Sequence, residues 1–263
     1  MTTRTMTRRG WQSLILAAAL GLLSACGGGD DGGSTQAGSA ETLAARLRTY
    51  EVVAPLSAAE AASLAYMREE EQLAHDVYAA SATLYSQALF PNITASEATH
   101  SAAVKTLLDR YAQPDPLQGL AEGQFKSAEF QALYARLTAA SRVSLGEALR
   151  VGAEIEELDM RDIAAQMAAI DNADILMVYD NLLRGSRNHL RAFMKALTRQ
   201  GGSYVPQYIS QAEFDAIVNS AVEAGGGGGG GVTGEGRVPF KEFIFFQKKA
   251  PPQLRPPAHP SAP

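Results

Sequence analysis

The chain has 263 residues, with 28 acidic and 23 basic side chains and a formal net charge of −5. This length is enough for one well-buried domain with additional segments at its ends. The single cysteine excludes an internal disulfide and any Cys-x-x-Cys metal knuckle. The acidic balance argues against nucleic acid as a partner, because nucleic-acid binding needs a positively charged surface.

The first 25 residues have the pattern of an export signal. Arg4, Arg8 and Arg9 precede an apolar run, Leu14–Leu23, which is too short to span a membrane as a mature helix. Small residues then precede Cys26, as in a bacterial lipobox; the alternative is an ordinary signal peptide followed by a chance cysteine. We predict a lipoprotein signal peptide at 1–25 and lipidation of the Cys26 sulfur, which would make the membrane a partner. Cleavage would remove three basic residues and no acidic one, leaving 20 basic and 28 acidic residues and a net charge of −8.

The segments on either side of the predicted domain have low-complexity compositions. Residues 26–40 are rich in glycine, serine and aspartate, which predicts a flexible tether. Gly27, rather than aspartate, follows the cysteine, and by resemblance to other bacterial lipoproteins this indicates an outer-membrane anchor facing the periplasm. Residues 225–263 begin with a glycine run and continue with phenylalanines and prolines, so we expect a disordered tail. A segment that docks on a partner or a membrane surface is the alternative.

Residues 41–224 are predicted to form one all-α domain. Apolar side chains recur at helical spacing in four long segments, with expected bounds of about 57–87, 92–111, 144–169 and 172–200. Shorter helices are expected at 41–53, at 127–140 and from Ser210 onward, and both Ser57 and Ser210 begin a capping box. Short first and third links with a long middle connection predict a ferritin-like four-helix bundle with a long middle crossover and short flanking helices.

The second long segment carries a candidate pair of metal ligands. Glu97 and His100 are three residues apart, so on a helix their side chains share a face. A carboxylate and an imidazole suit iron, manganese or zinc. Thr94 to Glu97 also has the spacing of a capping box, in which case Glu97 would close the start of a helix instead of binding metal.

The first long segment contains three consecutive glutamates, and they cannot all face the bundle interior. Glu70 and Glu71 are the two candidates for ligands, because each shares a side with apolar residues, whereas Glu69 is expected to face water. An acidic triplet is also typical of a solvated helix face. The case for ligands therefore depends on the Glu97 and His100 pair of the next helix.

The third and fourth long segments would supply the other half of the site. Glu156 and Glu157 are both candidates on the third helix, and we favour Glu157 with Glu156 close behind. On the fourth helix His189 follows an apolar stripe, where a histidine can also be an ordinary core residue. A complete double motif has glutamate three residues before this histidine, but here the residue is Ser186.

These segments resemble a bacterial ferritin-like family known only as a domain of unknown function. The resemblance spans about residues 57–220 and rests on the following stretches: Met67–Ala74 with Asp76–Tyr78, Asn92–Ile93 with Ser96–Glu97 and His100, Ile155–Asp159, Asn181–Leu190 with Phe193, and Tyr204–Tyr208. It implies a ferritin-like bundle without implying an activity. Residues 71–78 are also similar to the first metal helix of rubrerythrins, with Glu71 in the ligand position, and Glu97 and His100 fit the second. Because Ser186 departs from that pattern, a mononuclear site, an asymmetric pair and a site completed by Glu70 or Asp159 all stay open.

We therefore expect a metal-binding protein anchored to the cell envelope. The candidate ligands are Glu70, Glu71, Glu97, His100, Glu156, Glu157 and His189. One or two iron ions, or manganese, would support redox chemistry with peroxide or oxygen, as in a non-haem iron oxidoreductase. Electrons would come from an external donor, and a homodimer is compatible with this function. The alternative is a non-catalytic, lipid-anchored interaction or scaffold module that has lost part of the metal site.

Overall fold

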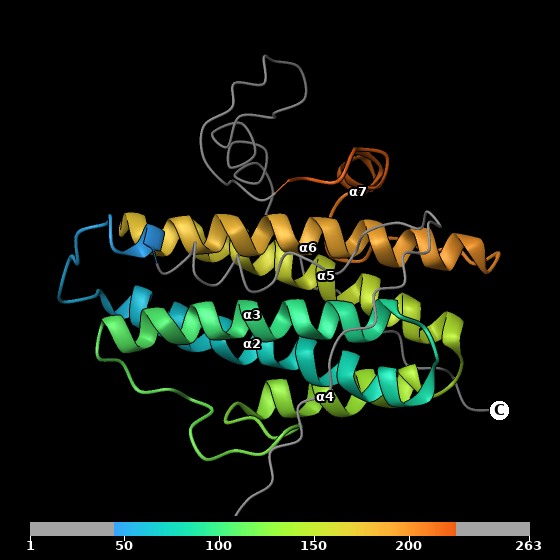
Figure 1. Cartoon of the computed structure of the whole chain (residues 1–263), viewed down its shortest axis with the longest axis horizontal. Helices are drawn as coiled ribbons and strands as arrows, with labels where there is room; N and C mark the ends of the chain where they lie inside the picture. The colour runs from blue at the N-terminus through green and yellow to red at the C-terminus, as the bar shows by residue number, and fades with distance from the viewer. Residues whose placement is uncertain (1–44, 225–263) are drawn as a thin grey trace, which may run out of the picture. The chain divides into compact units, whose positions relative to one another are not determined.

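The computed structural model describes residues 45–224 of the chain. The predicted signal peptide, Cys26, the tether at 26–40 and the tail at 225–263 lie outside the described residues. Within 45–224 the only regular secondary structure is helical, so the predicted all-α class is confirmed (Figure 1).

Six helices follow a helical turn at residues 45–47. They are α2 (Ala58–Leu84), α3 (Leu89–Arg110), α4 (Ala128–Ser141), α5 (Leu145–Met167), α6 (Ala173–Arg199) and α7 (Gln211–Val218). The prediction of a leading helix at 41–53 is wrong in its second half, because residues 51–53 have no helical structure.

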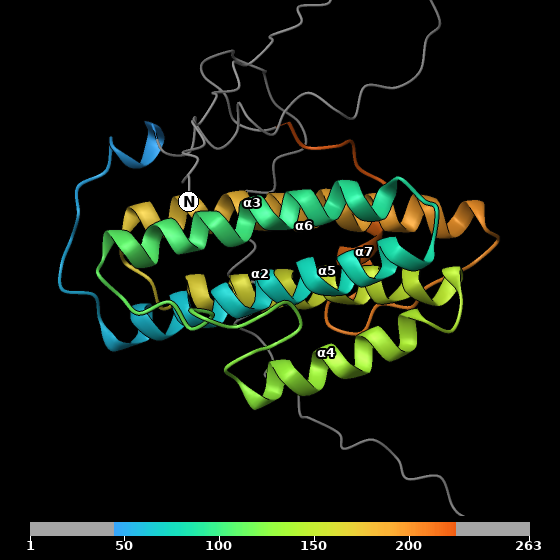
Figure 2. The ribbon, with the colours of Figure 1, turned by 60° about the horizontal axis from the view of Figure 1, so that its bottom comes forward.

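The four long helices form a bundle of two hairpins. The links from α2 to α3 and from α5 to α6 are short, so each pair runs antiparallel, and α3 packs on α6 while α2 packs on α5 (Figures 1 and 2). The connection from α3 to α5 is long and contains α4, which packs against α2 and α5. The predicted bundle with a long middle connection between its second and third long helices is therefore confirmed.

Serine side chains begin most of these helices, as the sequence predicts. Ser57 Oγ accepts a hydrogen bond from the Glu60 backbone N–H at 3.2 Å, and Glu60 Oε2 accepts one from the Ser57 N–H at 2.9 Å. This capping box satisfies backbone donors that have no partner inside the helix. At α7 the Ser210 side chain accepts from the Glu213 N–H. The capping residues thus define where α2 and α7 begin.

The start of α3 differs from the prediction, and it excludes the alternative in which Glu97 caps this helix. The helix begins at Leu89, before Pro91, because proline fits the first turn of a helix, where a backbone N–H has no intrahelical acceptor anyway. Thr94 Oγ1 accordingly donates to the carbonyl of Phe90 within the helix, at 2.8 Å. Glu97 lies two turns inside α3 and cannot cap its start.

The bundle interior is apolar at most positions but not at all of them. Leu64, Met67, Leu107, Ile155 and Phe193 are among the largest fully buried side chains. Several carboxylates are buried as deeply as these apolar side chains. A buried carboxylate without a partner lowers the free energy of unfolding by several kcal/mol. Among the described residues, no helix combines the length and apolar character needed to cross a membrane.

Candidate metal centre

Side chains from all four long helices converge at the middle of the bundle. Two groups of carboxylate and imidazole atoms form there, and within each group the potential ligand atoms lie within 4.8 Å of one another. The first group consists of Glu71 from α2 with Glu97 and His100 from α3. The second consists of the same Glu97 with Glu156 from α5 and His189 from α6.

Glu97 connects the two groups through its two oxygens. Its Oε2 lies 2.7 Å from His100 Nδ1, and its Oε1 lies 2.6 Å from His189 Nδ1. The two imidazole rings stack with their centroids 5.5 Å apart and an angle of 28° between their planes. One carboxylate thus presents an oxygen to each histidine, and the two groups share it.

The outer carboxylates complete the two groups from α2 and α5. Glu71 Oε2 lies 3.2 Å from His100 Nδ1, and Glu156 Oε1 lies 3.5 Å from His189 Nδ1. The other oxygen of each carboxylate, Glu71 Oε1 and Glu156 Oε2, is buried and has no hydrogen-bond partner among the described residues. Because a buried polar atom normally has a partner, these oxygens fit a bound cation. The nitrogen and oxygen donors suit iron, manganese or zinc.

Two neighbouring side chains hold the ligands in position. Ser96 Oγ is hydrogen-bonded to His189 Nε2 at 2.9 Å, which leaves Nδ1 facing the cluster. The Tyr78 hydroxyl donates to Glu156 Oε1 at 2.7 Å. Outer partners of this kind orient ligands and tune their basicity in metal sites. Sequence reasoning did not assign these roles, since neither contact follows from helical spacing.

Gly185 on α6 provides the space that His100 occupies. A Cβ at this position would lie 2.4 Å from His100 Cε1, closer than van der Waals contact allows. The ring therefore packs against the bare backbone of the facing helix. A glycine in the interior of a long helix is itself a sequence signal of close approach, because it lowers helix stability unless packing requires it.

Burial and mutual charge shift the proton affinities of the cluster. Burial raises the pKa of Glu71 to about 7, although the neighbouring His100 lowers it. Burial lowers the pKa of His189, but the carboxylates of Glu97 and Glu156 outweigh this and raise it to about 10. Burial also raises the pKa of Glu97, but the two histidines outweigh it and hold this pKa well below its ordinary value. Protons and cations therefore compete for these atoms, and metal binding would release protons from the histidines.

Glu157, which we favoured over Glu156 although spacing along the helix does not distinguish them, does not belong to either ligand group. Its Oε2 accepts hydrogen bonds from the Gln207 N–H at 2.7 Å, from the Tyr208 N–H at 3.2 Å and from the Tyr204 hydroxyl at 3.0 Å. Consecutive residues on a helix point about 100° apart, so Glu156 faces the interior while Glu157 faces this loop. Glu157 therefore holds the segment 204–208 against α5.

Glu69 and Glu70 lie on other sides of α2. Glu69 was expected to face water, which is wrong: it is buried and accepts a hydrogen bond from the Ser127 N–H at 2.9 Å, just before α4. Glu70 is buried outside both ligand groups, and burial together with the adjacent Asp162 raises its pKa well above the ordinary value. Asp162 in turn accepts from the Tyr66 hydroxyl at 2.9 Å.

The fourth helix offers one candidate ligand where a complete double motif would offer two. Ser186 is buried, and its hydroxyl donates to the Leu182 carbonyl at 3.2 Å, one turn earlier in α6. It therefore offers no carboxylate to the centre. His189 is the candidate ligand on α6.

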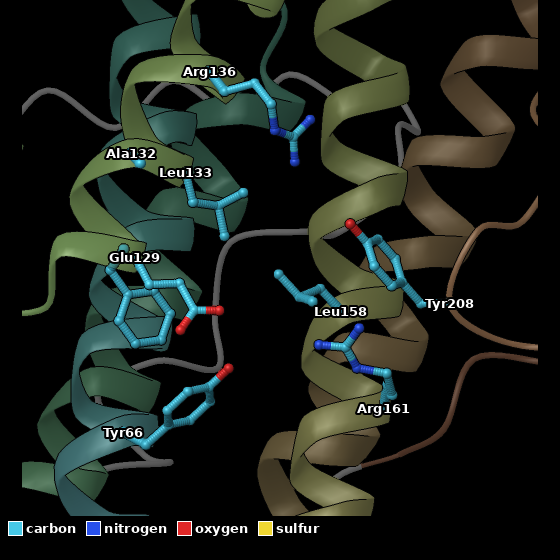
Figure 3. Close-up of a pocket in the computed structure, with 9 residues that line it drawn as sticks. Tyr66, Glu129, Ala132, Leu133, Arg136, Leu158, Arg161 and Tyr208 are labelled. Atoms are coloured by element: carbon cyan, nitrogen blue, oxygen red, sulfur yellow. The ribbon is translucent and has the colours of Figure 1, made fainter. Parts of the chain in front are cut away.

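A surface cleft of about 360 Å³ lies between α4 and α5 (Figure 3). Arg136 from α4, Arg161 from α5 and Tyr66 from α2 are among the residues that line it, and Tyr208 closes one side. None of the residues of the two ligand groups lines this cleft. The two ligand groups are therefore separate from the cleft.

The fold and the site define an all-helical bundle protein with a buried carboxylate and histidine cluster. Residues 60–221 match the family described as an uncharacterized protein domain, DUF2202, and the chain belongs to this family. This confirms the predicted membership in a family whose function is unknown.

The chain is similar to an uncharacterized archaeal protein. The chain is 44% identical over 171 residues to the uncharacterized protein MJ0754 of Methanocaldococcus jannaschii, an alignment that covers 65% of this chain and 92% of the relative. The crystal structure of the hypothetical protein MJ0754 from Methanococcus jannaschii matches with a TM-score of 0.65 and 43% identity, covering 66% of this chain and all of that chain.

Proposed function

We propose that this protein binds two metal ions inside a ferritin-like bundle, and that the ions are iron or, as a second choice, manganese. Glu71, Glu97 and His100 would hold one ion, and Glu97, Glu156 and His189 the other. The observation that carries the proposal is the shared carboxylate of Glu97, which directs one oxygen to each histidine. The long crossover and the contribution of ligands from four helices support the ferritin-like assignment.

The alternative, a scaffold without metal, fits the buried charges less well. Glu71, Glu97 and Glu156 are each at most 1% exposed, and two histidines are the only basic groups in the two clusters. Two protonated histidines balance at most two of these three carboxylates, and burying a carboxylate without cationic compensation is costly, so a fold that had lost its metal would be expected to replace such residues. Their presence supports a site that still binds cations.

Bound iron would supply redox chemistry toward peroxide or oxygen. The residues of this chain would bind and orient the ions, exclude bulk water and hold protons on the histidines when metal is absent. Electrons would have to come from an external donor, because the sequence has one cysteine and thus no cysteine-ligated redox centre of its own. The proposed place of this chemistry is the bacterial cell envelope, on the basis of the signal sequence and Cys26.

Metal content of the full-length protein tests the proposal. Protein from iron-supplemented cultures, and protein reconstituted anaerobically, should hold about two ions per chain, as two-metal sites of such bundles do. Glu97→Gln should lose both ions because Glu97 belongs to both groups, whereas Glu157→Gln, a change of a buried carboxylate outside the cluster, should keep them. Circular dichroism should show equal helicity for all three proteins.

The outcomes separate the two functions. Loss of metal in Glu97→Gln with retained helicity would support the site, and a peroxide and oxygen consumption assay on the iron-loaded protein would then test the redox chemistry. A wild-type protein that holds no iron or manganese after reconstitution would refute the proposal and favour the scaffold module.

A further inference from the structure

We propose that Asp159 supplies to the metal centre the carboxylate that α6 lacks. This inference rests on the proposed function. It makes the centre asymmetric, since α5 would contribute two carboxylates and α6 only His189.

The placement of Asp159 supports this role. It lies three residues after Glu156 on α5, so the two side chains share a face of the helix. It is 1% exposed, and neither of its oxygens has a hydrogen-bond partner among the described residues. Burial and the nearby charges of Glu70 and Glu71, followed by Glu156 and Glu97, raise its pKa well above the ordinary value. Asp159 thus lies among the carboxylates of the centre, on the side where α2 meets α5.

Charge balance gives the reason for a fourth carboxylate. With neutral histidines, Glu71, Glu97 and Glu156 carry three negative charges, while two divalent ions carry four positive ones. A buried site is most stable when its charges cancel, because uncompensated charge is costly in a low-dielectric interior. One more carboxylate makes the centre neutral, and Ser186 cannot provide it.

Glu70 is the competing candidate, and its surroundings differ. Glu70 is also buried, and neither of its oxygens has a hydrogen-bond partner among the described residues. The charges that shift its pKa are those of Asp162, Glu71 and Arg161, and only Glu71 belongs to the two ligand groups. The charges that shift the pKa of Asp159 include those of three residues of these groups, Glu71, Glu156 and Glu97. Its oxygens lie outside both close groups, so Asp159 would reach an ion through a bound water or after a change of side-chain rotamer.

Asp159→Asn in the full-length protein tests this inference, with Glu157→Gln as the matched control. Both residues are buried carboxylates on α5, but Glu157 bonds to the loop 204–208. Metal per chain and affinity, measured by competition with a chromogenic chelator, should fall by about 10- to 100-fold for at least one ion in Asp159→Asn. The metal-free variant should unfold at the same or a higher temperature than the wild type, because a neutral amide replaces an unpartnered carboxylate. Glu157→Gln should instead lower the unfolding temperature and keep both ions.

Asp159→Glu gives a second, independent reading. Asp159→Glu keeps the negative charge and should retain both ions. If the role of Asp159 were only steric, Asp159→Asn would retain the ions and the longer side chain of Asp159→Glu would disturb their binding. Wild-type metal affinity in Asp159→Asn would overturn the inference while leaving the proposed function intact. A wild-type protein without metal would refute the proposed function itself.

Discussion

The contact between Gly185 and His100 leads to a prediction that tests the geometry of the centre. In Gly185→Ala the new Cβ would lie 2.4 Å from His100 Cε1 and 2.6 Å from Nε2. The ring cannot simply turn away, because its Nδ1 is held by Glu97 and Glu71. We expect the ring to shift by enough to break at least one of these contacts, and the protein to lose metal affinity.

The size of the effect on stability follows from two opposing terms. Replacing a glycine in a helix by alanine stabilises by about 0.5–1 kcal/mol, whereas overpacking a filled interior costs about 1–3 kcal/mol. Gly146→Ala isolates the first term, since its Cβ would meet only Arg150 and Ser144, no closer than 3.6 Å. The free energy of unfolding of Gly185→Ala should therefore lie about 1–3 kcal/mol below that of Gly146→Ala.

Urea denaturation of the metal-free proteins measures this difference, and metal analysis measures the effect on the site. Gly152→Ala separates the two readouts, because its Cβ would lie 2.3 Å from Phe193 and not against a candidate ligand. It should lose stability like Gly185→Ala but keep its metal. Equal stability and equal metal content in Gly185→Ala and Gly146→Ala would refute the placement of His100 against α6.

Three further predictions concern the caps, the outer hydrogen bonds and the titration of the centre. Tyr78→Phe removes the donor to a buried oxygen of Glu156 and should lower the free energy of unfolding by about 1–3 kcal/mol in urea denaturation, without loss of helicity. Ser57→Ala breaks the capping box with Glu60 and should cost about 1 kcal/mol in the same assay; an unchanged midpoint would contradict the cap. The pKa of His189 is about 10 in the fold against an ordinary value of 6.5, so its contribution to stability is complete below about pH 6.5 and is lost as the pH rises through 10. The free energy of unfolding of the chelator-treated protein, measured between pH 6 and 10, should decline in this way. A free energy that does not change over this range would contradict the prediction.

The local features of this protein could be predicted from sequence because they depend on neighbours within one or two helical turns. Serine caps with the right acidic partner locate the starts of α2 and α7, and the three-residue spacing of Glu97 and His100 places both on one face of α3. The order of long and short links likewise predicts two hairpins joined by a long connection.

Only the tertiary structure decided which side of each helix faces the centre. Neighbouring residues on a helix differ in direction by about 100°, and the rotation of a helix in a bundle depends on its contacts with the other helices. Spacing alone therefore could not decide between Glu156 and Glu157, and the preference for Glu157 was wrong. In the packed bundle Glu156 faces the centre, and Glu157 accepts hydrogen bonds from the loop 204–208. The same reason explains why Glu69 is buried rather than solvated, and why Gly185 on one helix meets His100 on another.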